Sequence, residues 1–255
     1  MTPLRPSFAA PFLITLLLLS SPAFGNPLST EGTRSTRIEF TAYEREKDNG
    51  ITGTNVTVFL SGGYGRPDMD ALNRYMDYIN ANFAGTVSHL NHYSQMGFGV
   101  EWKGPKSLFA GMAFQWIDTS VKGSTVFAGQ SSSFRIDIDA GGLEIYGGLR
   151  TSRILGPLRL EALLGAGYYR SRYRERENGY DISGKDWAPG FRGGLGFMFS
   201  FSEHLSFHVN GSYRYLKFDD YNGGNGRVRF VSPGHPAAEA DFSGFMLEGR
   251  MALLF

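Results

Sequence analysis

The most constraining feature of this sequence is an alternation of apolar and polar residues that recurs along most of the chain. The clearest run has an apolar residue or glycine at every second position, at Leu205, Phe207, Val209, Gly211, Tyr213 and Tyr215. A period of two places successive side chains on opposite faces of a β-strand, whereas a helix has a period of 3.6. The pattern predicts eight strands, at residues 56–64, 96–102, 108–116, 143–149, 158–168, 191–201, 205–215 and 245–255. We expect the strand at 143–149 to extend back to Phe134 through a bulge near Gly141 and Gly142.

The connections between these strands alternate in length. Three are short, at residues 104–107, 151–157 and 202–204, and four are long, at 67–92, 120–133, 173–186 and 219–240. Short turns at one end and long loops at the other are typical of an antiparallel up-and-down transmembrane β-barrel. A soluble barrel with an apolar interior is the alternative. The aromatic residues decide between the two, because they gather near the ends of the apolar rows, as interfacial girdles do.

The polar rows then face the lumen. They contain Glu101, Glu144, Arg150, Arg159, Glu161, Arg192, His208, Arg214, Glu248 and Arg250. An eight-stranded barrel is just wide enough for side chains to fill it, and unpaired charges there would each cost several kcal/mol. We therefore expect a mixed Arg–Glu network that plugs the lumen. A narrow or gated conductance stays open as an alternative.

Composition excludes several other classes. The chain has 25 Lys and Arg against 24 Asp and Glu, a net charge of +1, so nucleic acid is not an expected partner. It has no cysteine, which excludes disulfides, thiol nucleophiles and Cys-ligated metals. His89 and His92 have no carboxylate beside them in the sequence, so no metal site or cofactor is predicted.

Residues 1–25 have the features of a cleavable secretory signal peptide. Arg5 precedes an apolar run, and Ala23 and Gly25 are small residues at the −3 and −1 positions of the expected cleavage site. We expect residues 26–53 to form an N-terminal periplasmic extension and residues 54–255 to form the barrel. Residues 36–46 also alternate, but a ninth strand would place the two termini on opposite sides of the membrane, so we favour the extension.

The signal sequence, the eight alternating strands and the rhythm of short and long connections resemble the small outer-membrane β-barrels of Gram-negative bacteria, the OmpA, OmpX and OmpW type. The resemblance covers residues 56–255 and implies a monomer with both termini in the periplasm. The last strand is similar to the signal that such proteins present to the outer-membrane assembly machinery. That signal would comprise Phe245, Leu247, Gly249, Met251, Leu253 and Phe255.

The first long loop contains a helical pattern. Met69, Leu72, Met76, Ile79 and Phe83 recur at steps of three and four residues, after a start signal at residues 67–68. We expect one amphipathic helix here, lying as a lid at the extracellular mouth.

Catalysis is a weaker hypothesis. His92 and Ser94 lie two residues apart, a spacing similar to the His-x-Ser of outer-membrane lipid A deacylases, but no acidic residue lies between 87 and 100 to orient the histidine. The sequence therefore predicts a non-enzymatic barrel with no catalytic residues and a structural, adhesive or weakly conducting role. A lipid A-modifying enzyme and a small-solute channel are the alternatives.

A lipid site is also predicted. Arg170 and Arg172 continue the lipid-facing row that runs from Leu158 to Tyr168, and Lys217 lies two residues beyond Tyr215 on another such row. Because arginine binds phosphate in a bidentate manner, we expect Arg170, Arg172 and Lys217 to bind the phosphates of lipopolysaccharide in the outer leaflet.

Overall fold

The structure is a computed structural model of the chain. It describes residues 56–104, 107–127, 129–152, 154, 157–177, 180–224, 226–230, 234 and 236–255. The predicted signal peptide, the predicted periplasmic extension, the possible strand at 36–46 and the first two positions of the predicted barrel, 54 and 55, lie outside the described residues.

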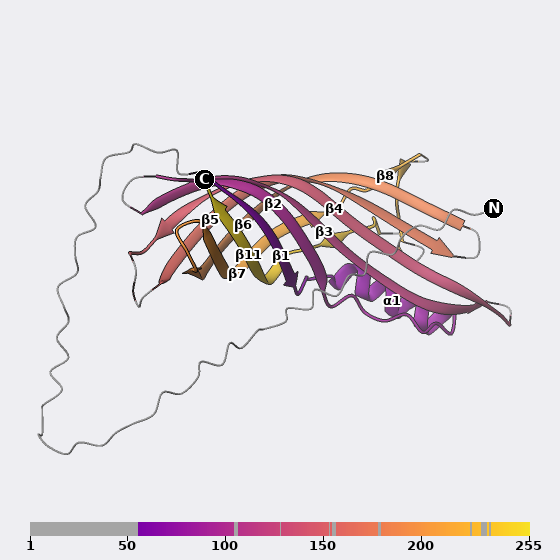
Figure 1. The fold of residues 1–255 in the computed structure, drawn as a ribbon. Coiled ribbons are helices and arrows are strands. Elements are labelled where there is room, and N and C mark those ends of the chain that lie inside the picture. Colours follow the sequence, from indigo (N-terminus) through magenta and orange to yellow (C-terminus); the bar gives the residue numbers. More distant parts are fainter. Residues whose placement is uncertain are drawn as a thin grey trace, which may run out of the picture. The chain divides into compact units, whose positions relative to one another are not determined.

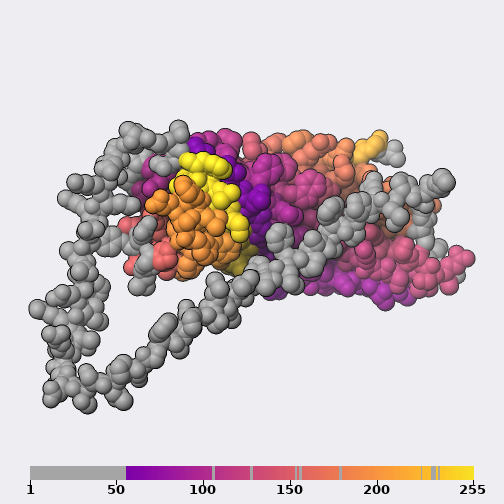
Figure 2. Space-filling view, viewed as in Figure 1, coloured from indigo at the N-terminus to yellow at the C-terminus, as the bar shows by residue number. Residues whose placement is uncertain are grey.

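Eight antiparallel strands form a closed barrel (Figure 1). They are β1 (Val56–Gly65), β2 (Tyr93–Lys103), β3 (Leu108–Phe127), β4 (Gln130–Arg150), β5 (Leu158–Glu177), β6 (Tyr180–Ser200), β7 (Leu205–Phe218) and β11 (Gly244–Leu254). Each strand pairs with the next, and β11 closes the sheet by pairing with both β7 and β1. Figure 2 shows this closure, with the first strand in indigo beside the last in yellow. The predicted fold is confirmed.

The outward face of the barrel carries an apolar belt. Its exposed side chains include Leu60, Phe98, Met112, Ile145, Leu164, Leu195, Leu247 and Met251. Exposed aromatic residues border the belt on the side of the long loops, at Tyr64, Trp116, Tyr168, Trp187, Tyr213 and Tyr215. An apolar band flanked by aromatic residues is the surface that a transmembrane barrel presents to lipid. On β5 the belt covers Leu158 to Tyr168, which we take as the membrane-spanning part of that strand.

No helix within the described residues is both long enough and apolar enough to cross a membrane.

The prediction of long loops was wrong for two of the four segments. Residues 120–133 and 173–186 are almost entirely strand, because β3 to β6 continue well beyond the aromatic border and turn only near residues 128 and 178. The predicted bulge near Gly141 was also wrong, since β3 and β4 pair in one unbroken register from Leu108↔Leu149 to Phe127↔Gln130.

The physical reason is an inversion of environment. Between Gly141 and the short-turn end of β4, the outward face belongs to the apolar belt and the inward face is polar. Between Gly141 and the cap end, the inward residues Phe134, Ile136 and Ile138 are fully buried. The apolar residues change sides of the strand because the surroundings change, and no extra residue is needed to turn them.

A cap covers the long-loop end of the barrel. It consists of helix α1 (Asp70–Asn82), the segment 83–92 that follows it, the described residues between 219 and 243, and the extended parts of β3 to β6 (Figure 1). Residues 219–243 include three short strands, β8 (Asn222–Gly223), β9 (Gly226–Arg227) and β10 (Ala240–Asp241). The predicted helix is thus confirmed, and its buried residues are Leu72, Tyr75, Met76 and Ile79.

The cap has its own hydrophobic core. The α1 residues pack in one cluster with Ile136 and Ile138 of β4 and Tyr173 of β5, and with Phe230 and Phe242 of the last loop. Two asparagines of α1 hold the returning segment. Asn80 exchanges two hydrogen bonds of 2.8 Å with the backbone of Val87, and Asn73 exchanges two with the backbone of Leu90, at 3.3 Å and 2.9 Å. This apolar core therefore closes the long-loop end above the lumen.

Candidate functional site

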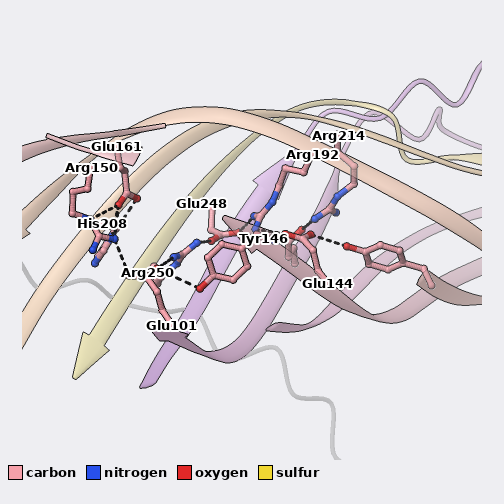
Figure 3. A network of polar contacts seen from close by, with 12 residues as sticks. Glu101, Glu144, Tyr146, Arg150, Glu161, Arg192, His208, Arg214, Glu248 and Arg250 are labelled. Carbon is pink, nitrogen blue, oxygen red and sulfur yellow. Dashed lines mark hydrogen bonds and ion pairs between the residues drawn. The ribbon is translucent and has the colours of Figure 1, made fainter. Parts of the chain in front are cut away.

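The lumen contains a network of ion pairs inside the membrane belt (Figure 3). Its charged members come from six strands: Glu101 (β2), Glu144 and Arg150 (β4), Glu161 (β5), Arg192 (β6), His208 and Arg214 (β7), and Glu248 and Arg250 (β11). They all stand on the inward-facing alternation of their strands, and all are buried. We call these nine residues the lumen network.

The network begins at the short-turn end. His208 Nδ1 lies 3.0 Å from Glu161 Oε2, and Arg150 Nη2 donates to the same oxygen at 3.0 Å. Arg150 Nη2 also donates to Glu101 Oε1 at 2.8 Å, and Arg250 Nη1 donates to Glu101 Oε2 at 3.2 Å. Each carboxylate at this end is thus shared by two basic groups.

The contacts continue toward the cap. Arg250 donates to Glu248 Oε1 at 3.3 Å, and Arg192 joins Glu248 to Glu144 by donating to both, at 2.6 Å and 2.5 Å. Tyr169 then donates its hydroxyl to Glu144 Oε2 at 2.9 Å. The result is a continuous line of alternating carboxylates and guanidinium groups along the barrel, visible in Figure 3.

A side branch carries Arg214. Its Nη2 donates to Gln95 Oε1 at 2.5 Å, and Gln95 Nε2 donates to Glu248 Oε2 at 3.0 Å. The Arg214 guanidinium also lies 5.9 Å from the ring centroids of both Tyr93 and Tyr169. These two tyrosines are the boundary between the polar lumen and the apolar core of the cap, because both belong to the core cluster.

Aromatic rings cover the flat faces of two guanidinium groups whose N–H edges make the ion pairs. Arg150 lies over Phe109 at 4.5 Å, and Arg250 lies over Phe59 at 4.4 Å and Tyr146 at 5.2 Å. A desolvated cation over a ring face gains attraction from the ring quadrupole. These rings therefore fill the part of the lumen beside Arg150 and Arg250.

The charges of the lumen network balance. Four glutamates oppose four arginines when His208 is neutral. A buried charge that loses its partner costs several kcal/mol, so a closed balance is what a dry lumen requires. Arg159, the other residue predicted for the lumen, is partly buried and lies nearer the short-turn end than this line.

Sequence reasoning missed the neutral members of the network. Gln95, Tyr146 and Tyr169 supply hydrogen bonds to Glu248, Glu101 and Glu144. Each stands at an even number of residues from a predicted lumen glutamate on its own strand, so following that parity along the strand would have found them.

His92 and Ser94, the pair considered for catalysis, lie at the outer edge of the barrel. The His92 ring stacks on Tyr64 with 5.4 Å between centroids, and the Ser94 hydroxyl donates to the backbone oxygen of Asp118 at 3.5 Å. Among the described residues, no hydrogen bond or ion pair connects His92 with Ser94 or with a carboxylate, and no group of three metal-ligating side chains is found.

The predicted lipid-binding residues lie just above the aromatic border. The Arg170 guanidinium covers Trp187 at 5.4 Å, and Trp187 in turn stacks on Tyr168 at 5.6 Å. Arg172 is exposed one pair of residues farther up the strand. Lys217 is held by Glu239, with 3.0 Å between Nζ and Oε1, so its charge is already neutralised.

The predicted assembly row is the outward face of β11. Phe245, Leu247, Met251 and Leu253 are exposed, and Phe255 is exposed beyond the end of the strand. Gly249 stands in the same row, with Gly62 opposite it on β1.

Comparison with known proteins finds similarity among solved structures. No protein-family model matches the chain, and no curated protein sequence matches it. Among solved structures, Ail, the attachment invasion locus protein of Yersinia pestis, is 14% identical, with a TM-score of 0.38 over 78% of this chain and 98% of Ail. The likeness is one of fold.

Two further structures are similar to this one. OprG from Pseudomonas aeruginosa is 12% identical, with a TM-score of 0.44 over 79% of this chain and 96% of OprG. Neisserial surface protein A is 9% identical, with a TM-score of 0.42 over 78% and 97% of the two chains. OprG is an outer membrane protein and Neisserial surface protein A is a surface protein by their names.

Proposed function

We propose that this chain is a sealed, non-enzymatic outer-membrane barrel whose role is to hold the folded cap at the cell surface, where it serves a structural or adhesive function. The proposed orientation places the short turns and both chain ends in the periplasm and the cap outside the cell. The observation that carries the proposal is the stacking of two different seals: the lumen network within the membrane belt and the apolar cap core above it.

The lumen network supports a barrel without a pore. Its side chains are buried, and its four carboxylates each contact at least one cation. An ion crossing the lumen would have to displace these pairs and then enter the apolar core around Tyr93 and Phe242, where an isolated charge is very costly. This second barrier argues against the weakly conducting alternative.

The charged lumen also argues against the alternative function, a channel for small solutes. A channel for apolar solutes needs an apolar path through the membrane, whereas the lumen of this barrel is charged. The cap, by contrast, is built as a rigid surface: β3 to β6 project it beyond the membrane and α1 is fixed to it over one whole face. A folded surface projected from a sealed anchor suits recognition better than transport.

The decisive test is planar-bilayer conductance of the refolded protein. We expect no resolved current steps for the wild type and none for the double variant Arg192→Ala and Arg250→Ala, because the cap core still closes the path. Steps are expected only when Tyr93→Ala and Phe242→Ala are added to that variant. Steady steps from the wild type would overturn the proposal. A lipid A mass assay on the same sample tests the enzymatic alternative, and a change in lipid A mass would establish it.

The orientation can be tested with cysteine labelling, because the chain has no cysteine of its own. Lys122 is exposed on the part of β3 that lies in the cap, and Lys103 is exposed at the short-turn end. A membrane-impermeant maleimide added to intact cells should label Lys122→Cys and spare Lys103→Cys. The opposite result would invert the orientation.

A further inference from the structure

A cationic cleft lies on the outer surface of the cap, apart from the lumen. Its volume is about 460 Å³, and it is bounded by β5, β6 and the first turn of the last loop. The residues around it are Arg172, Arg174, Ser183, Gly184, Lys185, Asn222, Gly223 and Gly224. Three of them are basic and none is acidic.

The basic residues are neighbours in the sheet. Arg172 stands directly opposite Lys185 across β5 and β6, and Arg174 stands opposite Ser183. Like charges at directly opposed positions repel each other and destabilise the pair of strands. An anion bound between Arg172 and Lys185 would turn this repulsion into two attractive contacts.

The carboxylates nearest the cleft leave part of this charge available. Asp139 stands opposite Arg172 on β4, and Asp181 Oδ1 lies 3.6 Å from Arg174 Nε. That distance is too long for a hydrogen bond, and the buried Nε of Arg174 has no hydrogen-bond partner. Lys185 makes no ion pair among the contacts of the described residues. The free positive charge of the cleft is therefore carried mainly by the exposed Lys185.

Three of the residues that line the cleft are glycines. A Cβ on Gly184 would come within 2.7 Å of Val228, and a Cβ on Gly223 would come within 2.4 Å of the Ser183 oxygen. Glycine is therefore needed for β8 to approach β6 closely, at the pairing of Lys185 with Asn222. The cleft results from this close approach, so its shape is built into the fold.

We propose that this cleft binds a phosphorylated saccharide. Arginine and lysine together favour phosphate, and the volume accommodates a sugar ring with its substituents rather than a bare ion. Arg172 lies four residues beyond Tyr168 of the aromatic border, about 13 Å along the strand at the usual rise. Because the strands of such barrels tilt by about 40°, this corresponds to about 10 Å along the membrane normal. We place that height at the sugars that are attached to the lipid headgroups. The choice of the membrane's own glycolipid as the source rests on the proposed outward orientation of the cap.

The first experiment uses inositol hexakisphosphate as a soluble probe and calorimetry on the full chain refolded in detergent. We expect binding by the wild type, a loss of about tenfold or more for the double variant Arg172→Gln and Lys185→Gln, and no binding of unphosphorylated inositol. The matched control is Lys122→Gln with Arg135→Gln, which removes the same charge from the cap surface outside the cleft. Absence of binding by the wild type, or an equal loss in both double variants, would overturn the proposal.

The second experiment identifies the source of the saccharide. The same proteins are captured on lipopolysaccharide that carries phosphorylated core sugars and on the same material after removal of the core phosphates. Retention of the wild type should fall after dephosphorylation, and the cleft variant should be retained equally weakly on both. Equal retention of the wild type on both would overturn the assignment to the glycolipid. The sealed-barrel proposal fails on a different measurement, the conductance of the wild type.

Discussion

Ile138 and Ile145 lie on the same strand, point to opposite sides of the barrel wall, and are both in apolar surroundings. The side chain of Ile138 faces inward into the cap core and is 0% exposed. The side chain of Ile145 faces outward in the apolar belt and is 64% exposed on the outer surface of the barrel. The strand between them is regular. The outward residues beside Ile138 are Asp137 and Asp139, both partly exposed. The medium outside the wall therefore changes from lipid to water between the levels of the two isoleucines, and the inward lining changes with it.

This inversion predicts opposite sensitivities at the two positions. Ile145→Arg places a charge in the belt and should destabilise the membrane-inserted barrel by about 2–4 kcal/mol, measured by urea unfolding in bilayers. Ile138→Arg leaves the belt intact but should disrupt the cap, so that protease cuts α1 while the barrel stays inserted. Ile145→Leu is the control and should be neutral. Loss of insertion by the Ile138 variant alone would contradict the assignment of the membrane boundary.

The lumen network predicts a strong asymmetry between buried and exposed arginines. Arg192 bridges Glu144 and Glu248 with its side chain buried, so Arg192→Met leaves two carboxylates close together and should cost about 3–5 kcal/mol. Arg176 lies 3.7 Å from Asp181 at the surface, and Arg176→Met should change stability by less than about 1 kcal/mol. Unfolding in urea, followed by tryptophan fluorescence, measures both. Equal costs would mean that the lumen is wet.

Glu175 predicts a pH dependence of the cap. It lies in the part of β5 beyond the membrane belt, where Tyr75 of α1 donates to Oε1 at 2.7 Å and Tyr173 donates to Oε2 at 2.6 Å. Burial raises the pKa of Glu175 above its usual range, and the two tyrosine hydrogen bonds only partly oppose this. Glu177 on the same strand adds a like charge that raises the pKa further.

The sign follows from proton linkage. Because the folded cap holds the Glu175 proton more tightly than the unfolded chain, the cap is most stable below the usual glutamate pKa and loses stability as the pH rises through the raised value. Hydrogen exchange in α1 should therefore speed up with rising pH beyond the intrinsic chemical effect. Glu175→Gln keeps an oxygen that accepts from one tyrosine and an NH2 group that can donate to the hydroxyl of the other, and because the amide does not titrate it should abolish that extra dependence. An identical pH profile in the variant would contradict the prediction.

The lipid-facing row predicts a difference between two cations at similar height. Arg170→Ser should lower the thermal stability in lipopolysaccharide-containing bilayers more than in phosphatidylcholine, because the guanidinium held over Trp187 lies where lipid phosphates are expected. Lys217→Ser should have a smaller effect, since its ammonium is already paired with Glu239. A shift of the same size in both kinds of bilayer would sink the lipid assignment of Arg170.

The sequence alone was sufficient for the barrel. Its period of two identified all eight strands, and the polar parity identified the charged residues of the lumen network, because a strand in a barrel wall must present different side chains to lipid and to the lumen. The helical spacing from Leu72 to Ile79 likewise predicted α1 before any tertiary contact was known.

Only the tertiary structure decided how far the strands extend and which charges meet. Alternation shows that the two faces of a strand differ, but it does not show which medium lies on each side, so the inward row of Phe134, Ile136 and Ile138 was mistaken for evidence of a bulge. The pairing of Arg192 with both Glu144 and Glu248 depends on the stagger of strands far apart in the chain. The cleft beside Arg172 depends on β8 folding back onto β6. Local sequence cannot encode these contacts, because closing the barrel brings them together.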